Sequence, residues 1–190
     1  MKNLEYCKYT YRHRKAFCYI VNKIITNETV KKEMLIRARF HDLDKMTLYL
    51  FLEKKISSSY HRNFSHHHLE NNLPKTFYDY LESIIDFECA GYTKPDKPLN
   101  AYDTIEKIFK DKIDSNIYDS LIDILKKYNL NSSYCVLDDR AGLEYLKKYE
   151  NVTEEMILYE VLDYINNCKN NSFKIFQKDI LKTIEKGELL

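Results

Sequence analysis

The scarcity of chain-breaking residues is the feature that most restricts what this chain can fold into. Only three glycines and three prolines occur among its 190 residues. A β-rich protein of this length needs many turns, and turns draw heavily on both residue types. Apolar side chains instead recur at helical spacing along most of the sequence. The sequence therefore predicts an all-α protein.

The apolar spacing predicts a series of helices with short polar connections. The first helix runs from about Glu5 to Ile25, the second begins after an N-cap at Thr29, and the third is capped by Asp44 or Asp42. Residues 57–72 lack clear periodicity and are expected to form a loop or a short helix. Further helices are expected near residues 76–91, 100–112, 116–128, 137–149, 153–168 and 172–187.

We expect two parts in this helical bundle, a histidine-bearing core over residues 1–113 and a helical extension over residues 114–190 that packs on the core. The proline-punctuated stretch from Thr93 to Leu99 is the strongest break in the sequence. No linker of distinct composition separates the two parts, so their boundary is not marked sharply.

Charge and cysteine usage restrict the compartment and the partners. Thirty lysines and arginines nearly balance 29 acidic residues, which argues against a dedicated nucleic-acid surface. The five cysteines are odd in number and widely spaced, as in reduced cytoplasmic proteins. No apolar run approaches the length of a membrane span. We therefore expect a cytoplasmic protein without a membrane partner, and the oligomeric state stays open.

All six histidines fall between residues 13 and 68, and this crowding predicts a metal site. Imidazole and carboxylate groups are the usual ligands of zinc and of catalytic first-row metals. The candidate ligands follow one another as His13, His41, Asp42, His61, His66, His67 and Asp86. His41 and Asp42 are adjacent and would point about 100° apart on a regular helix. They can converge on metal ions only where the backbone turns.

Ordinary structural roles compete with this interpretation. A lone His-Asp pair is usually a helix cap beside a surface histidine, and an inward-facing His13 is usually a core residue. Lys45 favours a site, because on a helix it shares a face with His41 and Asp42. The neighbouring His67 and His68 are hard to separate as ligands. For the last ligand, Asp86 competes with Asp79, Glu88 and Asp103.

The order of these residues resembles the metal-binding pattern of the HD superfamily of metal-dependent phosphohydrolases, in the longer form that supports more than one metal. The segment from His41 to Lys45 is similar to the His-Asp-x-x-Lys signature of its phosphodiesterase-type members. The segment from His61 to His67 and the helix around Asp86 extend the likeness to a small group of bacterial and phage proteins. The likeness covers roughly the first 105 residues.

The resemblance implies two metal positions that share a bridging Asp42. His13, His41, Asp42 and Asp86 would hold the first metal, and Asp42 with His61 and either His66 or His67 would hold the second. Asp42 and Lys45 would be catalytic, with Lys45 contacting substrate phosphate. Arg62, next to the cluster, is a second candidate for binding the substrate.

The expected function is hydrolysis of a phosphate ester in a small phosphorylated molecule, with a nucleotide as the leading substrate. Six or so nitrogen and oxygen ligands favour manganese, iron, cobalt or nickel, with zinc and magnesium as alternatives. A di-iron oxygenase of the same fold would use a very similar ligand set, and a non-catalytic nucleotide-binding protein is the third hypothesis. Metal analysis and a substrate screen would separate the three.

Overall fold

The fold is a bundle of helices around a long N-terminal helix. The structure is a computed structural model that describes residues 3–94, 96–168 and 171–186. Within those ranges it contains helices and no strand, which confirms the predicted all-α class. The helices are α1 (Leu4–Ile24), α2 (Glu28–Phe40), α3 (Leu43–Phe51), α4 (Lys54–Phe64), α5 (Phe77–Thr93), α6 (Ala101–Thr104), α7 (Ser115–Lys127), α8 (Arg140–Lys147), α9 (Glu154–Asn167) and α10 (Gln177–Lys186). None of these described helices is long and apolar enough to cross a membrane.

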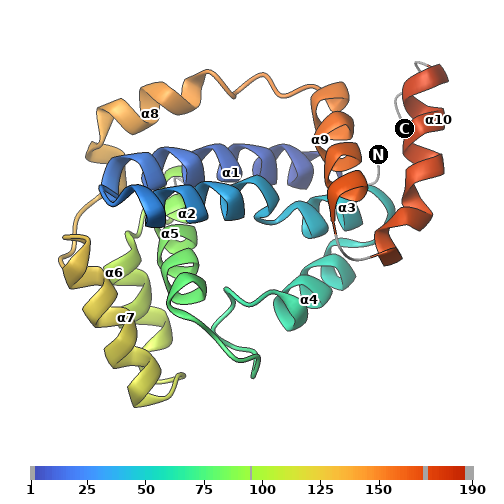
Figure 1. The fold of residues 1–190 in the computed structure, drawn as a ribbon. Coiled ribbons are helices and arrows are strands. Elements are labelled where there is room, and N and C mark those ends of the chain that lie inside the picture. The colour runs from blue at the N-terminus through green and yellow to red at the C-terminus, as the bar shows by residue number, and fades with distance from the viewer. Residues whose placement is uncertain (1–2, 95, 169–170, 187–190) are drawn as a thin grey trace.

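Helix α1 is the element on which the others pack. Helices α2, α3, α5, α8 and α9 all contact it (Figure 1). Of the apolar side chains whose spacing predicts this helix, Phe17, Ile20 and Val21 are fully buried and Ile24 is partly buried. Burying them removes a continuous apolar stripe from water, which stabilises a helix of this length far more than its intrinsic propensity does.

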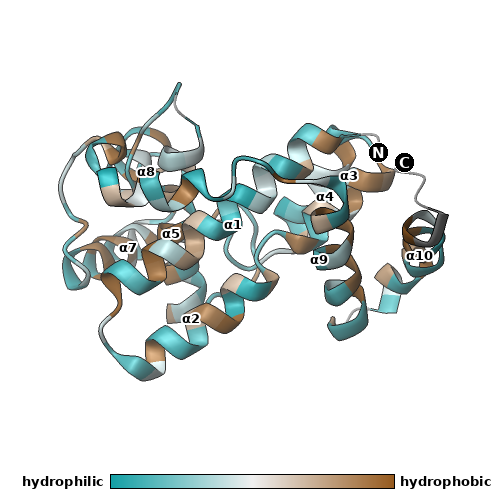
Figure 2. Cartoon of the chain, turned by 90° about the horizontal axis from the view of Figure 1, so that it is seen from above, coloured by the Kyte–Doolittle hydropathy of each residue, from teal (hydrophilic) through white to brown (hydrophobic). Residues whose placement is uncertain are grey.

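Two hydrophobic cores lie along α1. The first surrounds Phe17 and Ile20 and joins α1 to α2, α5 and α7, and apolar residues gather where α5 meets α7 (Figure 2). The second surrounds Tyr11 and joins the start of α1 to α3 and α9. The histidine cluster begins at His13, which lies on α1 between Tyr11 and Phe17. The site is therefore held at the junction of the two cores.

Residues beyond 113 contribute to both cores. Helix α7 packs on α5 in the first core, whereas α9 packs on α1 and α3 in the second core and α10 lies against α9 (Figure 1). Glu160 on α9 forms ion pairs with Arg14 and Lys15 on α1. Helices beyond residue 113 thus pack on helices before it, and the division into a core and an extension near residue 113 stays a prediction.

One local prediction needs correction, and a second, which left a loop and a short helix open, can be made definite. The N-cap of α2 is Asn27 and not Thr29, because the Asn27 side chain accepts a hydrogen bond from the Val30 amide. The polar stretch after residue 57 begins as helix α4 and becomes irregular only after Phe64. Buried Ser57 and His61 lie four residues apart on the inner face of α4, so polar residues provide a periodicity that apolar residues alone do not reveal.

Candidate metal centre

A turn between α2 and α3 makes His41 and Asp42 converge. Asp42 adopts the left-handed conformation, with φ at 57°, so the chain does not continue the helix of α2. Aspartate tolerates this conformation better than most residues with a Cβ. The Asp42 side chain makes no capping hydrogen bond to α3, and only 4% of the residue is exposed. The backbone turn that adjacent ligands require is therefore present, and the carboxylate is turned into the site.

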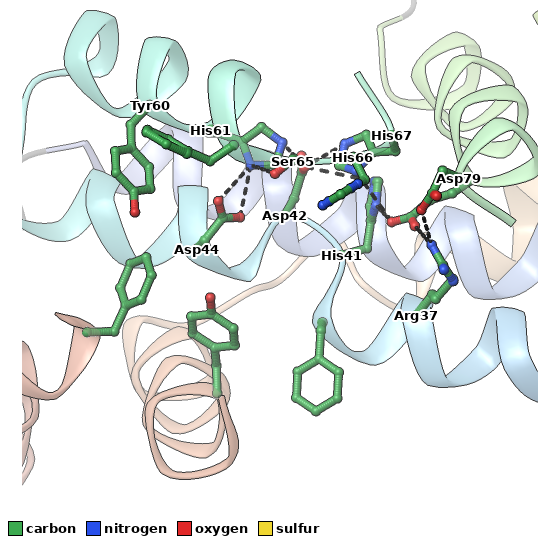
Figure 3. A pocket seen from close by; sticks show the side chains of 15 residues that line it. Arg37, His41, Asp42, Asp44, Tyr60, His61, Ser65, His66, His67 and Asp79 are labelled. Carbon is green, nitrogen blue, oxygen red and sulfur yellow. Dashed lines mark hydrogen bonds and ion pairs between the residues drawn. The ribbon is translucent and has the colours of Figure 1, made fainter. Parts of the chain in front are cut away.

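The Asp42 carboxylate lies among three imidazoles and one ammonium group. Its Oδ1 atom is 2.7 Å from Nε2 of His61, 3.7 Å from Nε2 of His67 and 4.0 Å from Nε2 of His41. Its Oδ2 atom accepts a hydrogen bond from Nζ of Lys45 at 3.0 Å. Figure 3 shows these histidines around Asp42. Asp42 is thus placed where a bridging ligand would be needed.

Asp86 on α5 closes the other side of the cluster. Its Oδ1 atom is 2.6 Å from Nε2 of His13 and 3.5 Å from Nε2 of His41. The rival acids lie elsewhere. Asp79 pairs with Arg37 and caps α5, Glu88 accepts a hydrogen bond from the Ala101 amide, and Asp103 pairs with Lys107. Of the acids considered as last ligand, the structure therefore brings Asp86 to the histidines.

Four imidazole nitrogens in this cluster are buried without a hydrogen-bond partner in the described structure. They are the Nε2 atoms of His41, His61, His67 and His68. The contact between His61 Nε2 and Asp42 Oδ1 is short, but it lacks the geometry of a hydrogen bond. A buried polar atom without a partner costs about 1–3 kcal/mol. Four of them in one place are best explained by a ligand that accepts their lone pairs.

The spacing of the ligand atoms fits metal ions. Ligand atoms lie within 4.8 Å of one another in each of three groups: His13 with His41 and Asp42, His41 with His67 and Asp86, and His61 with His67 and His68. Two ligands at about 2.1 Å from one ion are separated by about 3 Å, so such groups can close around an ion with small movements. The buried Nε2 atoms and the carboxylates together form a donor set for one or two cations.

A second layer of acids orients the imidazoles. Glu82 Oε1 accepts a hydrogen bond from Nδ1 of His41 at 3.0 Å and lies 3.4 Å from Nδ1 of His67. Asp44 accepts from Nδ1 of His61 at 2.9 Å. Arg37 in turn donates to the other Glu82 oxygen at 2.9 Å. A proton held at Nδ1 leaves the lone pair at Nε2, which is the arrangement typical of metal-binding histidines.

The acids also control the charge of the imidazoles. Burial alone would lower the pKa of His41, but Asp42, Asp86 and Glu82 outweigh it and raise the pKa to about 10. The pKa of His61 is raised to about 9 against the same burial, by Asp42 and Asp44. Burial and the nearby His41 lower the pKa of His67 to about 3. The carboxylates therefore attract positive charge to the cluster, and metal cations would supply that charge in place of protons.

The structure does not bring His66 into the cluster. The residue is exposed, and its Nδ1 atom donates to the Pro74 carbonyl. In the turn after α4, His67 and His68 belong to a group of candidate ligands, whereas His66 lines a cavity with aromatic walls beside the cluster (Figure 3). We therefore replace His66 with His68 in the ligand set. The sequence of three histidines could not reveal this, because the segment outside α4 has no regular periodicity.

Open cavities reach the cluster from two directions. One cavity of about 360 Å³ is lined by the ligands His13, Asp42, His68 and Asp86, together with Lys45, Arg62 and Lys94. Another, of about 410 Å³, lies on the side of Glu82 and Asp44 and has aromatic walls, among them Tyr60, Tyr164 and Phe173 (Figure 3). Both cavities expose candidate ligands, since His41, Asp42, His61 and His67 line the aromatic cavity; the first, called the basic cavity, differs from it by carrying Lys45, Arg62 and Lys94. Its lining cations make the basic cavity the better suited of the two to an anion.

No protein-family model matches this chain, and neither a curated protein nor a solved structure matches it. Membership of the HD superfamily therefore stays a prediction. The function has to be inferred from the histidine–aspartate cluster and the cavities beside it.

We expect Glu82→Ala to weaken metal binding by about ten- to a hundredfold, the usual effect of losing a partner that orients a ligand. Glu82 serves both His41 and His67, so its loss frees two rings at once. Calorimetric titration with Mn²⁺ measures the effect. Glu33→Ala is the matched control, since Glu33 also pairs with Arg37 but does not touch a histidine. Equal affinities in both variants would remove Glu82 from the metal centre.

Proposed function

We propose that this protein is a metal-dependent phosphohydrolase or phosphodiesterase acting on a small phosphorylated substrate, with a nucleotide as the leading candidate. The observation that carries the proposal is the cluster of unpartnered Nε2 atoms beside Asp42 and Asp86, at the base of a basic cavity. Catalytic metals in hydrolases need such an open ligand set, whereas structural metals are enclosed.

The ligand set divides into two groups that share Asp42. His13, His41, Asp42 and Asp86 would hold one metal, and Asp42, His61, His67 and His68 would hold another. Nitrogen and oxygen ligands in this number favour manganese, iron, cobalt or nickel over a closed tetrahedral zinc site. Divalent metals held here would polarise a phosphoryl group and activate water for attack on phosphorus.

Lys45 would bind the phosphoryl oxygens. It follows Asp42 by three residues in the first turn of α3, and 20% of its side chain is exposed toward the basic cavity. Burial opposes its charge, but Asp42 outweighs burial and raises the Lys45 pKa. Lys45 therefore stays protonated and cannot ligate a metal, but it can donate hydrogen bonds to an anion.

We expect Lys45→Met to leave the metal content unchanged and to slow phosphate-ester turnover by about ten- to a hundredfold, equivalent to about 1.4–2.7 kcal/mol of transition-state stabilisation. Metal content is measured by elemental analysis, and turnover by phosphate release from an aryl phosphate and from nucleotides. Lys126→Met is the control, because Lys126 also pairs with an aspartate three residues earlier but lies on the surface of α7. A wild-type rate for Lys45→Met would exclude Lys45 from the reaction.

A di-iron oxygenase is the second candidate. The nitrogen-rich donors around a shared carboxylate also suit a pair of iron ions, and this observation favours it over other redox chemistry. Iron-dependent oxygen uptake without phosphate release would support the oxygenase and contradict the hydrolase. Binding of a nucleotide without either reaction, in protein loaded with each metal in turn, would indicate a non-catalytic binding protein.

A further inference from the structure

A further cavity, distinct from the basic and the aromatic cavities and called the second cavity below, adjoins the basic cavity of the metal centre. Its volume is about 510 Å³, and its walls include Tyr6, Tyr49 and Lys54. This cavity and the basic cavity share four lining residues, which are Tyr9, Lys45, Arg62 and Lys94. Each cavity falls within the range of about 300–1,000 Å³ that is typical of small-molecule sites. A substrate bound at the metals can therefore extend into the second cavity.

Three cations of the second cavity form no ion pair with the described residues. Within the part of the chain that the structure describes, Lys54, Arg62 and Lys94 have no carboxylate oxygen within the 4.0 Å of an ion pair. Nζ of Lys54 lies 4.1 Å from the centre of the Tyr6 ring, and Nζ of Lys94 lies 5.7 Å from that of Tyr9. An aromatic face attracts an ammonium group without cancelling its charge. The tyrosines therefore hold the lysines at the wall while leaving them available to an anion.

The basic cavity at the metal centre does not account for Lys54. Lys45 is already paired with Asp42, and Arg62 and Lys94 line the basic cavity as well as the second one. Lys54 lines the second cavity and not the basic cavity. Asp96 is the carboxylate residue on the same wall, so cations outnumber acids there. An anion away from the reacting phosphate would satisfy this imbalance.

We propose that the second cavity binds a second anionic group of the substrate, so that the substrate is a phosphate ester carrying another phosphate or a comparable group. This inference rests on the proposed function, because it takes the first phosphate to lie at the metals. Lys54 and Lys94 donate charge-assisted hydrogen bonds to the second group, and the tyrosine faces pack on the part that joins the two groups.

The test uses alkyl bisphosphonates with two to eight carbons between the phosphonates, and matched alkyl monophosphonates, titrated calorimetrically into the manganese-loaded protein. We expect at least one bisphosphonate to bind about tenfold more tightly than its monophosphonate, a gain of about 1.4 kcal/mol. Lys54→Gln should abolish that gain and leave monophosphonate affinity unchanged. Lys55→Gln should preserve the gain, because Lys55 is exposed and lines neither cavity.

The outcomes separate this inference from the proposed function. Monophosphonate binding without any gain from a second phosphonate, at every chain length, would overturn the second site alone. A gain that survives Lys54→Gln would also overturn it, as would equal weakening of both ligand types by that variant. If the loaded protein binds no monophosphonate and hydrolyses no phosphate ester, the proposed function fails and the second site fails with it.

Discussion

Asp42→Asn is expected to release bound metal and to abolish turnover while leaving the helices intact. The neutral amide removes the negative charge shared by His41, His61 and His67, and an amide is a poor ligand for two cations at once. The loss should exceed the ten- to hundredfold effect of an orienting residue such as Glu82. The fold should survive because asparagine also tolerates the left-handed φ of 57° and because Asp42 makes no capping bond.

Elemental analysis and circular dichroism of the purified variant measure the two parts of this prediction. His66→Ala should keep its full metal content, because His66 is exposed and bonded to Pro74. Asp119→Asn, a change of an exposed acid on α7, controls for the loss of one negative charge. Full metal occupancy in Asp42→Asn would end the metal-site interpretation. Loss of metal in His66→Ala would restore that histidine to the ligand set.

Gly91→Ala is expected to destabilise the protein by about 1–3 kcal/mol, the usual cost of overpacking. Gly91 lies on α5, and a Cβ there would collide with the Leu99 carbonyl oxygen and come within 2.7 Å of Val136 Cγ2. The first of these neighbours is backbone and cannot rotate away. A Gly→Ala substitution at an open helical position usually stabilises a protein by about 0.4–1 kcal/mol. The sign of the change in unfolding free energy therefore tells whether Gly91 is closely packed or has open space around it.

Thermal unfolding followed by circular dichroism measures the Gly91 effect. For a chain of this size each kcal/mol corresponds to about 2–4 °C in the midpoint, so a fall of several degrees is expected. An unchanged or higher midpoint would show that α5 does not sit closely against the segment around Leu99. Because α5 also carries Glu82 and Asp86, metal affinity should fall together with stability if the helix shifts.

The long helices could be predicted from the sequence because their apolar faces are buried in the cores. The predicted first helix, from about Glu5 to Ile25, matches α1 (Leu4–Ile24) closely. The cap of α2 could not be chosen in the same way, because Asn27 and Thr29 are both suitable capping residues and the difference is decided by which one meets the Val30 amide. The helical part of the polar histidine segment is set by tertiary packing of Ser57 and His61.

The candidate site could be predicted in part. His13, His41, Asp42, His61, His67 and Asp86 lie together as expected, since helical spacing and the turn at Asp42 bring them to one point. Glu82 was missed, although its place four residues before Asp86 on α5 puts both acids on one face of that helix. The choice of His68 over His66 depends on an irregular turn. The basic cavities depend on segments far apart in the chain, which no local pattern reveals.

Anomalous diffraction from crystals grown with manganese tests the central claim most directly. We expect at least one strong manganese peak within coordination distance of the Asp42 carboxylate, bounded by Nε2 of His41 and the Asp86 carboxylate. A second peak would lie on the side of His61, His67 and His68. A site without manganese density, with peaks only at surface acids, would contradict the metal centre and the hydrolase proposed from it.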